Sequence, residues 1–166
     1  MSEHIVNIED LEYRDWQHGD KFEARLGAIS ARTGAKKLGY NLTVLLPGKR
    51  AFPFHSHRVN EEMFFVLEGT GEVRIGEETF AVKSGDVIAC PPGGPETAHQ
   101  LCNTSETEKM KYLAVSTTMS PEIAEYPDSD KTGVYGEFAS ETGGKPSIMR
   151  FIIKDQAGMA DYWEDE

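Results

Sequence analysis

The sequence predicts an all-β domain, built as an antiparallel sandwich or barrel. Short runs that favour strands follow one another at regular spacing from residue 37 to residue 117, a pattern typical of such folds. Glycine-bearing breaks separate many of the runs, and glycine suits tight hairpins because it reaches positive φ without steric cost. No sustained helical periodicity interrupts the series, so we expect little helix.

Nine strands are expected along the chain. They cover residues 22–30, 37–47, 62–68, 72–75, 78–83, 87–90, 99–103, 109–117 and 148–153. The second is the clearest, because Tyr40, Leu42 and Val44 alternate with Asn41 and Thr43. A loop rich in proline and glycine, PPGGPETA, stands between the sixth and seventh strands.

One domain with two arms is the predicted organisation. A chain of 166 residues can bury one core but is short for two. Residues 1–20 lack a clean period and are expected to form an N-terminal arm, with the barrel over residues 21–117. Residues 118–166 are rich in turn formers, so we expect a C-terminal arm that packs on the barrel or on a partner subunit, with at most one helical turn after Pro121.

Composition excludes some classes of partner. Seventeen basic against twenty-eight acidic residues give a net charge of −11, which disfavours binding to nucleic acid and to anionic membranes. No run approaches the ~20 apolar residues that span a bilayer, and the polar N-terminus does not resemble a signal peptide. We therefore expect a cytoplasmic location, with Cys90 and Cys102 as buried, reduced thiols.

Two histidines one residue apart, His55 and His57, indicate a metal site. On a strand their side chains share one face, ~6.6 Å apart, and can converge on one ion. Glu61 or Glu62 at the start of the next strand could add a carboxylate, and parity with the apolar positions of that strand favours Glu62. His99, at the start of a later strand, could complete a four-ligand pocket inside a small barrel.

This donor set is a mixture of imidazole nitrogen and carboxylate oxygen. It suits Mn, Fe, Ni, Co or Zn better than Ca or Mg. The other histidines, His4 and His18, lie in the polar N-terminal segment and are better explained as solvated or packed side chains.

The spacing of these residues resembles the cupin superfamily. The first cupin motif is G(x)5HxH(x)3-4E(x)6G, and here His55, His57, Glu62 and Gly69 follow it, with one extra residue between Gly48 and His55.

The second cupin motif is G(x)5PxG(x)2H(x)3N. Gly85, Pro91, Gly93, His99 and Asn103 match it, with three extra residues before the histidine.

The resemblance implies an antiparallel double-stranded β-helix, also called a cupin or jelly-roll barrel. It also implies one bound divalent transition metal, Zn, Mn, Fe or Ni, on four ligands. These ligands are His55, His57, Glu62 and His99. The chain is further similar to small bacterial single-domain cupins of unassigned activity, some of them described as sugar-phosphate isomerases.

Function is expected to follow from positions left open on the metal. An octahedral ion with four protein ligands keeps two sites for a small-molecule ligand or substrate. Four functions stay open: a metal-dependent isomerase, a lyase or decarboxylase, an Fe-dependent dioxygenase, and a non-catalytic small-molecule-binding cupin. No catalytic residue is assigned. A sugar phosphate would need at least two cations in the pocket; Arg50 and Arg58 flank the histidine pair but are ordinarily solvated charges.

A homodimer is the expected assembly. Both arms carry aromatic side chains that a small barrel could hardly bury alone, at Trp16 and Phe22 and at Tyr162 and Trp163.

Overall fold

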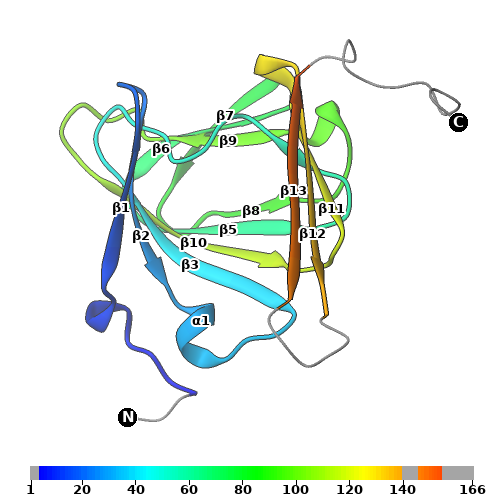
Figure 1. The fold of residues 1–166 in the computed structure, drawn as a ribbon. Helices are drawn as coiled ribbons and strands as arrows, with labels where there is room; N and C mark the ends of the chain where they lie inside the picture. Colours follow the sequence, from blue (N-terminus) through cyan, green and yellow to red (C-terminus); the bar gives the residue numbers. More distant parts are fainter. Residues whose placement is uncertain (1–3, 140–145, 155–166) are drawn as a thin grey trace, which may run out of the picture.

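Antiparallel β-strands dominate the computed structural model, which describes residues 4–139 and 146–154 (Figure 1). The strands are β1 (Tyr13–His18), β2 (Phe22–Ala28), β3 (Leu38–Leu45), β4 (Ser56–His57), β5 (Glu62–Glu68), β6 (Thr70–Ile75), β7 (Glu78–Lys83), β8 (Val87–Cys90), β9 (His99–Cys102), β10 (Met110–Thr117), β11 (Glu122–Tyr126), β12 (Lys131–Phe138) and β13 (Ser147–Lys154). The short helices are η1 (Ile8–Asp10), α1 (Ser30–Thr33), η2 (Pro95–Thr97) and η3 (Pro127–Ser129). The all-β prediction is confirmed.

These strands form three sheets. The first has the order β1-β2-β3-β10-β5-β8, the second β7-β6-β9 and the third β13-β12-β11-β4. Figure 1 shows β11, β12 and β13 standing across one end of the other two sheets. The short strand β4, which carries His57, joins this third sheet by pairing with β11.

The main core lies between the first two sheets. Its buried side chains are Ala24, Leu45, Ala51, Phe64, Val66, Val73, Val82, Ile88, Cys90, Leu101, Met110 and Tyr112. Burying one large apolar side chain contributes about 1.5–3 kcal/mol, so this cluster holds the sheets together. In β5, Phe64 and Val66 face the core, and by the period of two Glu62 begins the strand on the same face.

Gly69 illustrates why glycine stands at the breaks. Its φ is 85°, and an added Cβ would lie 2.5 Å from the carbonyl oxygen of Lys109. A larger residue would strain the backbone and displace the neighbouring segment. The tight connection between β5 and β6 therefore depends on this glycine.

The interpretation of residues 118–138 as an arm without strands is wrong. Strand β11 starts directly after Pro121, where at most a helical turn was expected, and β12 follows it. The alternation was hidden because β11 buries Glu122 and Ala124 while Ile123 is 38% exposed. A strand that turns a carboxylate inward does not show the usual apolar period.

The N-terminal segment also contributes a strand, because β1 pairs along its whole length with β2. Trp16 packs on its own chain: Nε1 donates to the carbonyl oxygen of Ala51 at 2.8 Å, and its ring contacts Phe52. Tyr162 and Trp163 lie outside the described residues. The homodimer and the boundaries of the arms at residues 20 and 117 stay predictions.

Two further expectations concern thiols and membranes. Both cysteines are free, with Cys90 buried and Cys102 half-buried. None of the helices in the described part of the chain has the length and apolar character required to cross a bilayer. The cytoplasmic location stays a prediction.

Candidate metal centre

Backbone pairing places His55 beside His99. The N–H of His55 donates to the carbonyl oxygen of His99 at 3.2 Å, and the N–H of His99 donates back at 2.8 Å. His57 follows His55 by two residues in an extended segment, so both side chains lie on the same face. The centroids of the two rings are 4.9 Å apart. Phe54 and Ser56, on the alternate positions, are fully buried.

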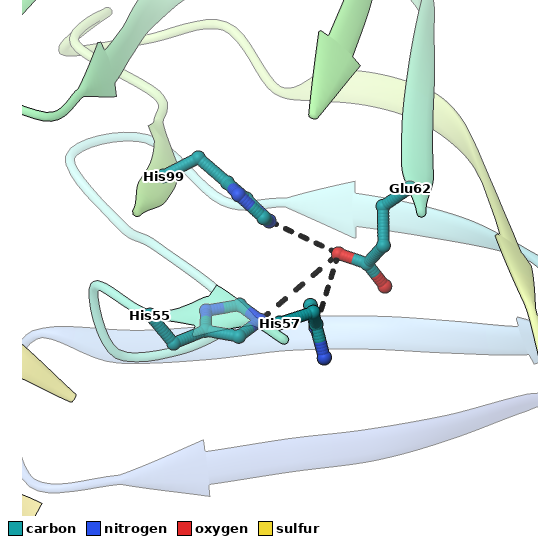
Figure 2. A group of neighbouring side chains, drawn as sticks. All are labelled: His55, His57, Glu62 and His99. Atoms are coloured by element: carbon teal, nitrogen blue, oxygen red, sulfur yellow. Dashed lines mark hydrogen bonds and ion pairs between the residues drawn. The ribbon is translucent and has the colours of Figure 1, made fainter. Parts of the chain in front are cut away.

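Glu62 completes the cluster from the start of β5 (Figure 2). Its Oε2 atom lies 3.0 Å from Nε2 of His99, 3.7 Å from Nε2 of His57 and 4.0 Å from Nε2 of His55. One ligand atom from each of the four residues lies within 4.8 Å of all the others. Ligands of one ion at about 2.0–2.2 Å can be up to about 4.4 Å apart, so the cluster is within a few tenths of an ångström of a metal cage.

The hydrogen bonds of two histidines leave their Nε2 atoms facing the centre. Nδ1 of His55 lies 2.8 Å from the carbonyl oxygen of Pro53, and Nδ1 of His99 lies 3.3 Å from that of Thr97. A carbonyl oxygen can only accept, so Nδ1 of His55 carries the proton in its contact with Pro53. This tautomer makes Nε2 the available ligand atom.

His57 supplies the clearest sign of a missing partner. Both of its ring nitrogens are shielded from solvent and have no hydrogen-bond partner among the described residues. An unsatisfied buried polar group costs about 1–3 kcal/mol. A metal ion at Nε2 would remove part of this cost, so the donor set fits the ion that the ligand chemistry suggests.

The protonation states of His55 and Glu62 also suit metal binding. Burial, together with the nearby rings of His99 and His57, lowers the pKa of His55 to about 4. Burial alone would raise the pKa of Glu62, but the close contacts with the His57 and His99 rings outweigh burial and hold that pKa below its usual range. At neutral pH His55 is therefore neutral and Glu62 ionised, as metal ligation requires.

Glu122 is a buried carboxylate beside the cluster that the sequence pattern did not reveal. This buried carboxylate accepts backbone N–H bonds from Arg58 at 3.2 Å, Val59 at 3.2 Å and Asn60 at 2.7 Å, and a short bond from the Asn60 side chain. These residues form the turn between His57 and Glu62. Glu122 Oε2 also lies 3.7 Å from Nδ1 of His57, so one side chain fixes the turn and faces the ring.

The two arginines that flank the histidine pair engage other partners. Arg58 pairs with Glu125 at 2.8 Å, and Arg50 donates to Gln100 Oε1 at 3.1 Å. The structure thus brings together all four predicted ligands, whereas Glu61 is exposed and lies outside the cluster. That the four residues bind a metal stays a prediction.

Comparison with known families gives one domain match. The family described as "Cupin domain" matches residues 41–116, a range that includes all four clustered residues. Two curated relatives match in sequence: an uncharacterized protein from Methanocaldococcus jannaschii is 39% identical over 49 residues, and cupincin from Oryza sativa subsp. indica is 33% identical over 92 residues. The chain spans 39% and 18% of their respective lengths, so less than half of either.

Solved structures share the fold over more of the chain. A sugar phosphate isomerase from a cupin superfamily, from Silicibacter pomeroyi, is 22% identical with a TM-score of 0.69, covering 88% of this chain and 92% of that one. A predicted oxalate decarboxylase from Thermotoga maritima is 22% identical with a TM-score of 0.59, covering 69% of this chain and 99% of that one. Identities this low establish a shared double-stranded β-helix and nothing of activity.

Proposed function

We propose that this chain, whose residues 41–116 match the cupin domain, is a metalloenzyme that converts a small metabolite at a single transition-metal ion. The observation that carries this proposal is the convergence of four ligand atoms within 4.8 Å of one another, contributed by three histidines and a glutamate. His55, His57, Glu62 and His99 would hold the ion.

The donor set narrows the choice of ion. Three imidazoles and one carboxylate favour Zn, Mn, Fe or Ni over Ca or Mg. Such an ion, when bound, supplies Lewis acidity or, if redox-active, oxygen chemistry. The protein contributes a neutral imidazole at His55, an ionised Glu62 and a cluster whose four side chains are all less than one-fifth exposed.

Activity would test this function directly. The protein, stripped by a chelator and then reloaded with Zn, Mn, Fe or Ni in turn, is incubated with sugar phosphates and small oxo and hydroxy acids while product and oxygen uptake are followed. We expect turnover that disappears on stripping and returns with one of the metals. Oxygen consumption with Fe would assign the dioxygenase branch, and turnover without oxygen the isomerase or lyase branch.

A matched pair of glutamates supplies the control. Glu62→Gln removes a ligand, whereas Glu61→Gln changes the exposed neighbour, so only the first should abolish turnover. Thermal stabilisation by a compound without product from any metal form would contradict catalysis and identify a binding module instead.

A further inference from the structure

The face of the third sheet that carries His57 continues across all four strands. In the register, His57 is opposite Ala124, Ala124 is opposite Gly133, and Gly133 is opposite Ile152. Directly opposed residues of antiparallel strands present their side chains on the same face. We call this the inner face, and every second residue of β11, β12 and β13 belongs to it.

Two tyrosines of the inner face extend the metal centre. The hydroxyls of Tyr126 and Tyr135 lie 2.9 Å apart, and the Tyr126 ring stacks on His55 with centroids 6.1 Å apart. The bare backbone of Gly133 makes room for this pair, since a Cβ there would lie 2.6 Å from the Tyr135 hydroxyl. A pair of hydroxyls is thereby held next to the ligand cluster.

Three cations lie on the same face as the tyrosines, and two of them contact a tyrosine ring. Lys131 is paired with Tyr126 in the strand register, and its Nζ lies 5.6 Å from the Tyr126 ring centroid. Arg150 is paired with Tyr135, and its Cζ lies 5.5 Å from the Tyr135 ring centroid. Lys154 is directly opposite Lys131. Opposed like charges destabilise a sheet, so this arrangement gains stability when an anion lies between them.

The carboxylates of the inner face do not neutralise these cations. Glu122 is buried, and its oxygens accept bonds from the turn before β5. Glu137 lies at the far end of β12, opposite Ile148. Within residues 4–139 and 146–154, no carboxylate comes within ion-pair distance of Lys131, Arg150 or Lys154. A positive patch therefore adjoins the metal centre of a chain whose net charge is −11.

We propose that the tyrosine pair, Lys131 and Arg150 bind the anionic group, a phosphate or a carboxylate, of the small molecule on which the metal centre acts. The proposal rests on the metalloenzyme function above. The tyrosines lie between the ligand cluster and the cations, so a short substrate can contact the metal ligands at one end and the cations at the other. Charge-assisted hydrogen bonds from lysine and arginine are the stronger kind, and they select against uncharged analogues.

Three probes of equal carbon number test the anion requirement. Glycerol 3-phosphate, glycerate and glycerol are titrated calorimetrically into the metal-loaded full-length protein. We expect one or both anions to bind at least about tenfold more tightly than glycerol, since a hydrogen bond to a charged group contributes about 1.5–3 kcal/mol. A preference for glycerol 3-phosphate assigns a phosphate, and a preference for glycerate a carboxylate.

Substitutions locate the anion. Lys131→Met and Arg150→Met should each weaken binding of the preferred anion about tenfold or more, and Tyr135→Phe should weaken it less. Lys83→Met, an exposed lysine on β7, is the matched control and should bind as the wild type does. Equal binding of glycerol and both anions, or losses in Lys131→Met and Arg150→Met no larger than in Lys83→Met, would overturn the proposal.

Metal content, measured on the same samples, separates this proposal from the one before it. A full complement of metal without anion preference removes the anion site and leaves the metalloenzyme function intact. Absence of metal from the wild type removes the metalloenzyme function and, with it, the assignment of the anion as part of a substrate.

Discussion

The two sides of the metal centre are held in different ways. His99 is 2% exposed, its Nε2 lies 3.0 Å from Glu62, and its Nδ1 faces the carbonyl oxygen of Thr97. Among the residues that the structure describes, none forms a hydrogen bond with either ring nitrogen of His57, whose Nδ1 faces Glu122 Oε2 at 3.7 Å. One side is fixed by short contacts within the barrel, and the other by a carboxylate from β11.

The four clustered residues and the carboxylate that faces His57 come from different parts of the chain. All four predicted ligands lie within residues 41–116, the range of the domain match, whereas Glu122 lies beyond it. The matched range therefore holds the four predicted ligands, whereas the carboxylate that faces His57 comes from β11, outside that range.

The largest effect is expected from removing both histidines of one strand. His55→Ala with His57→Ala leaves only Glu62 and His99, too few ligands to retain an ion through purification, so bound metal should disappear. Circular dichroism should show an unchanged strand signal, because the main core lies elsewhere. Retention of the metal would show that another set of residues binds it.

Glu62→Gln should come next in size. Its Oε2 atom is the common neighbour of all three histidines, so the loss of metal affinity should exceed the ~10- to 100-fold typical of supporting residues. Metal affinity is measured by competition with a chromophoric chelator. In this measurement the control variant Glu61→Gln should bind metal as tightly as the wild type. If both variants lost metal affinity to the same extent, the negative charge of this segment would explain binding, and Glu62 Oε2 would not be a specific ligand atom.

Glu122→Gln should have a smaller effect, confined to the His57 side. We expect metal affinity to fall about 10- to 100-fold, and the free energy of unfolding to fall by about 1–3 kcal/mol because acceptors of buried N–H groups are lost. Chelator competition and urea denaturation measure the two quantities.

A second background separates positioning from simple structural support. In His57→Ala protein, Glu122→Gln should still lower stability but should no longer change metal affinity. An equal loss of affinity in both backgrounds would show that Glu122 acts through the fold as a whole and not through His57.

The sequence predicted the barrel and the ligand cluster for clear physical reasons. Strands such as β5 bury alternate apolar residues, and the same parity selects Glu62 over Glu61. His55 directly precedes β4 and His57 ends it, and their side chains still share one face because a period of two is a local property.

Two strands of the third sheet, β11 and β12, could not be predicted in the same way. On the inner face they carry Glu122, Tyr126, Lys131 and Tyr135 instead of a uniform apolar set, so they lack the usual hydrophobic signal. Glu122 is buried only because four backbone N–H groups and the Asn60 side chain converge on it. That convergence depends on the pairing of β4 with β11, which local sequence does not reveal.

The central claim is that one transition-metal ion sits at His55, His57, Glu62 and His99. Elemental analysis of the purified full-length protein, after reconstitution with Zn, Mn, Fe and Ni in separate samples and removal of excess ion, tests it most directly. We expect about one ion per chain for at least one metal and none in the His55→Ala, His57→Ala variant. A folded wild-type protein that retains none of the four metals would contradict the claim.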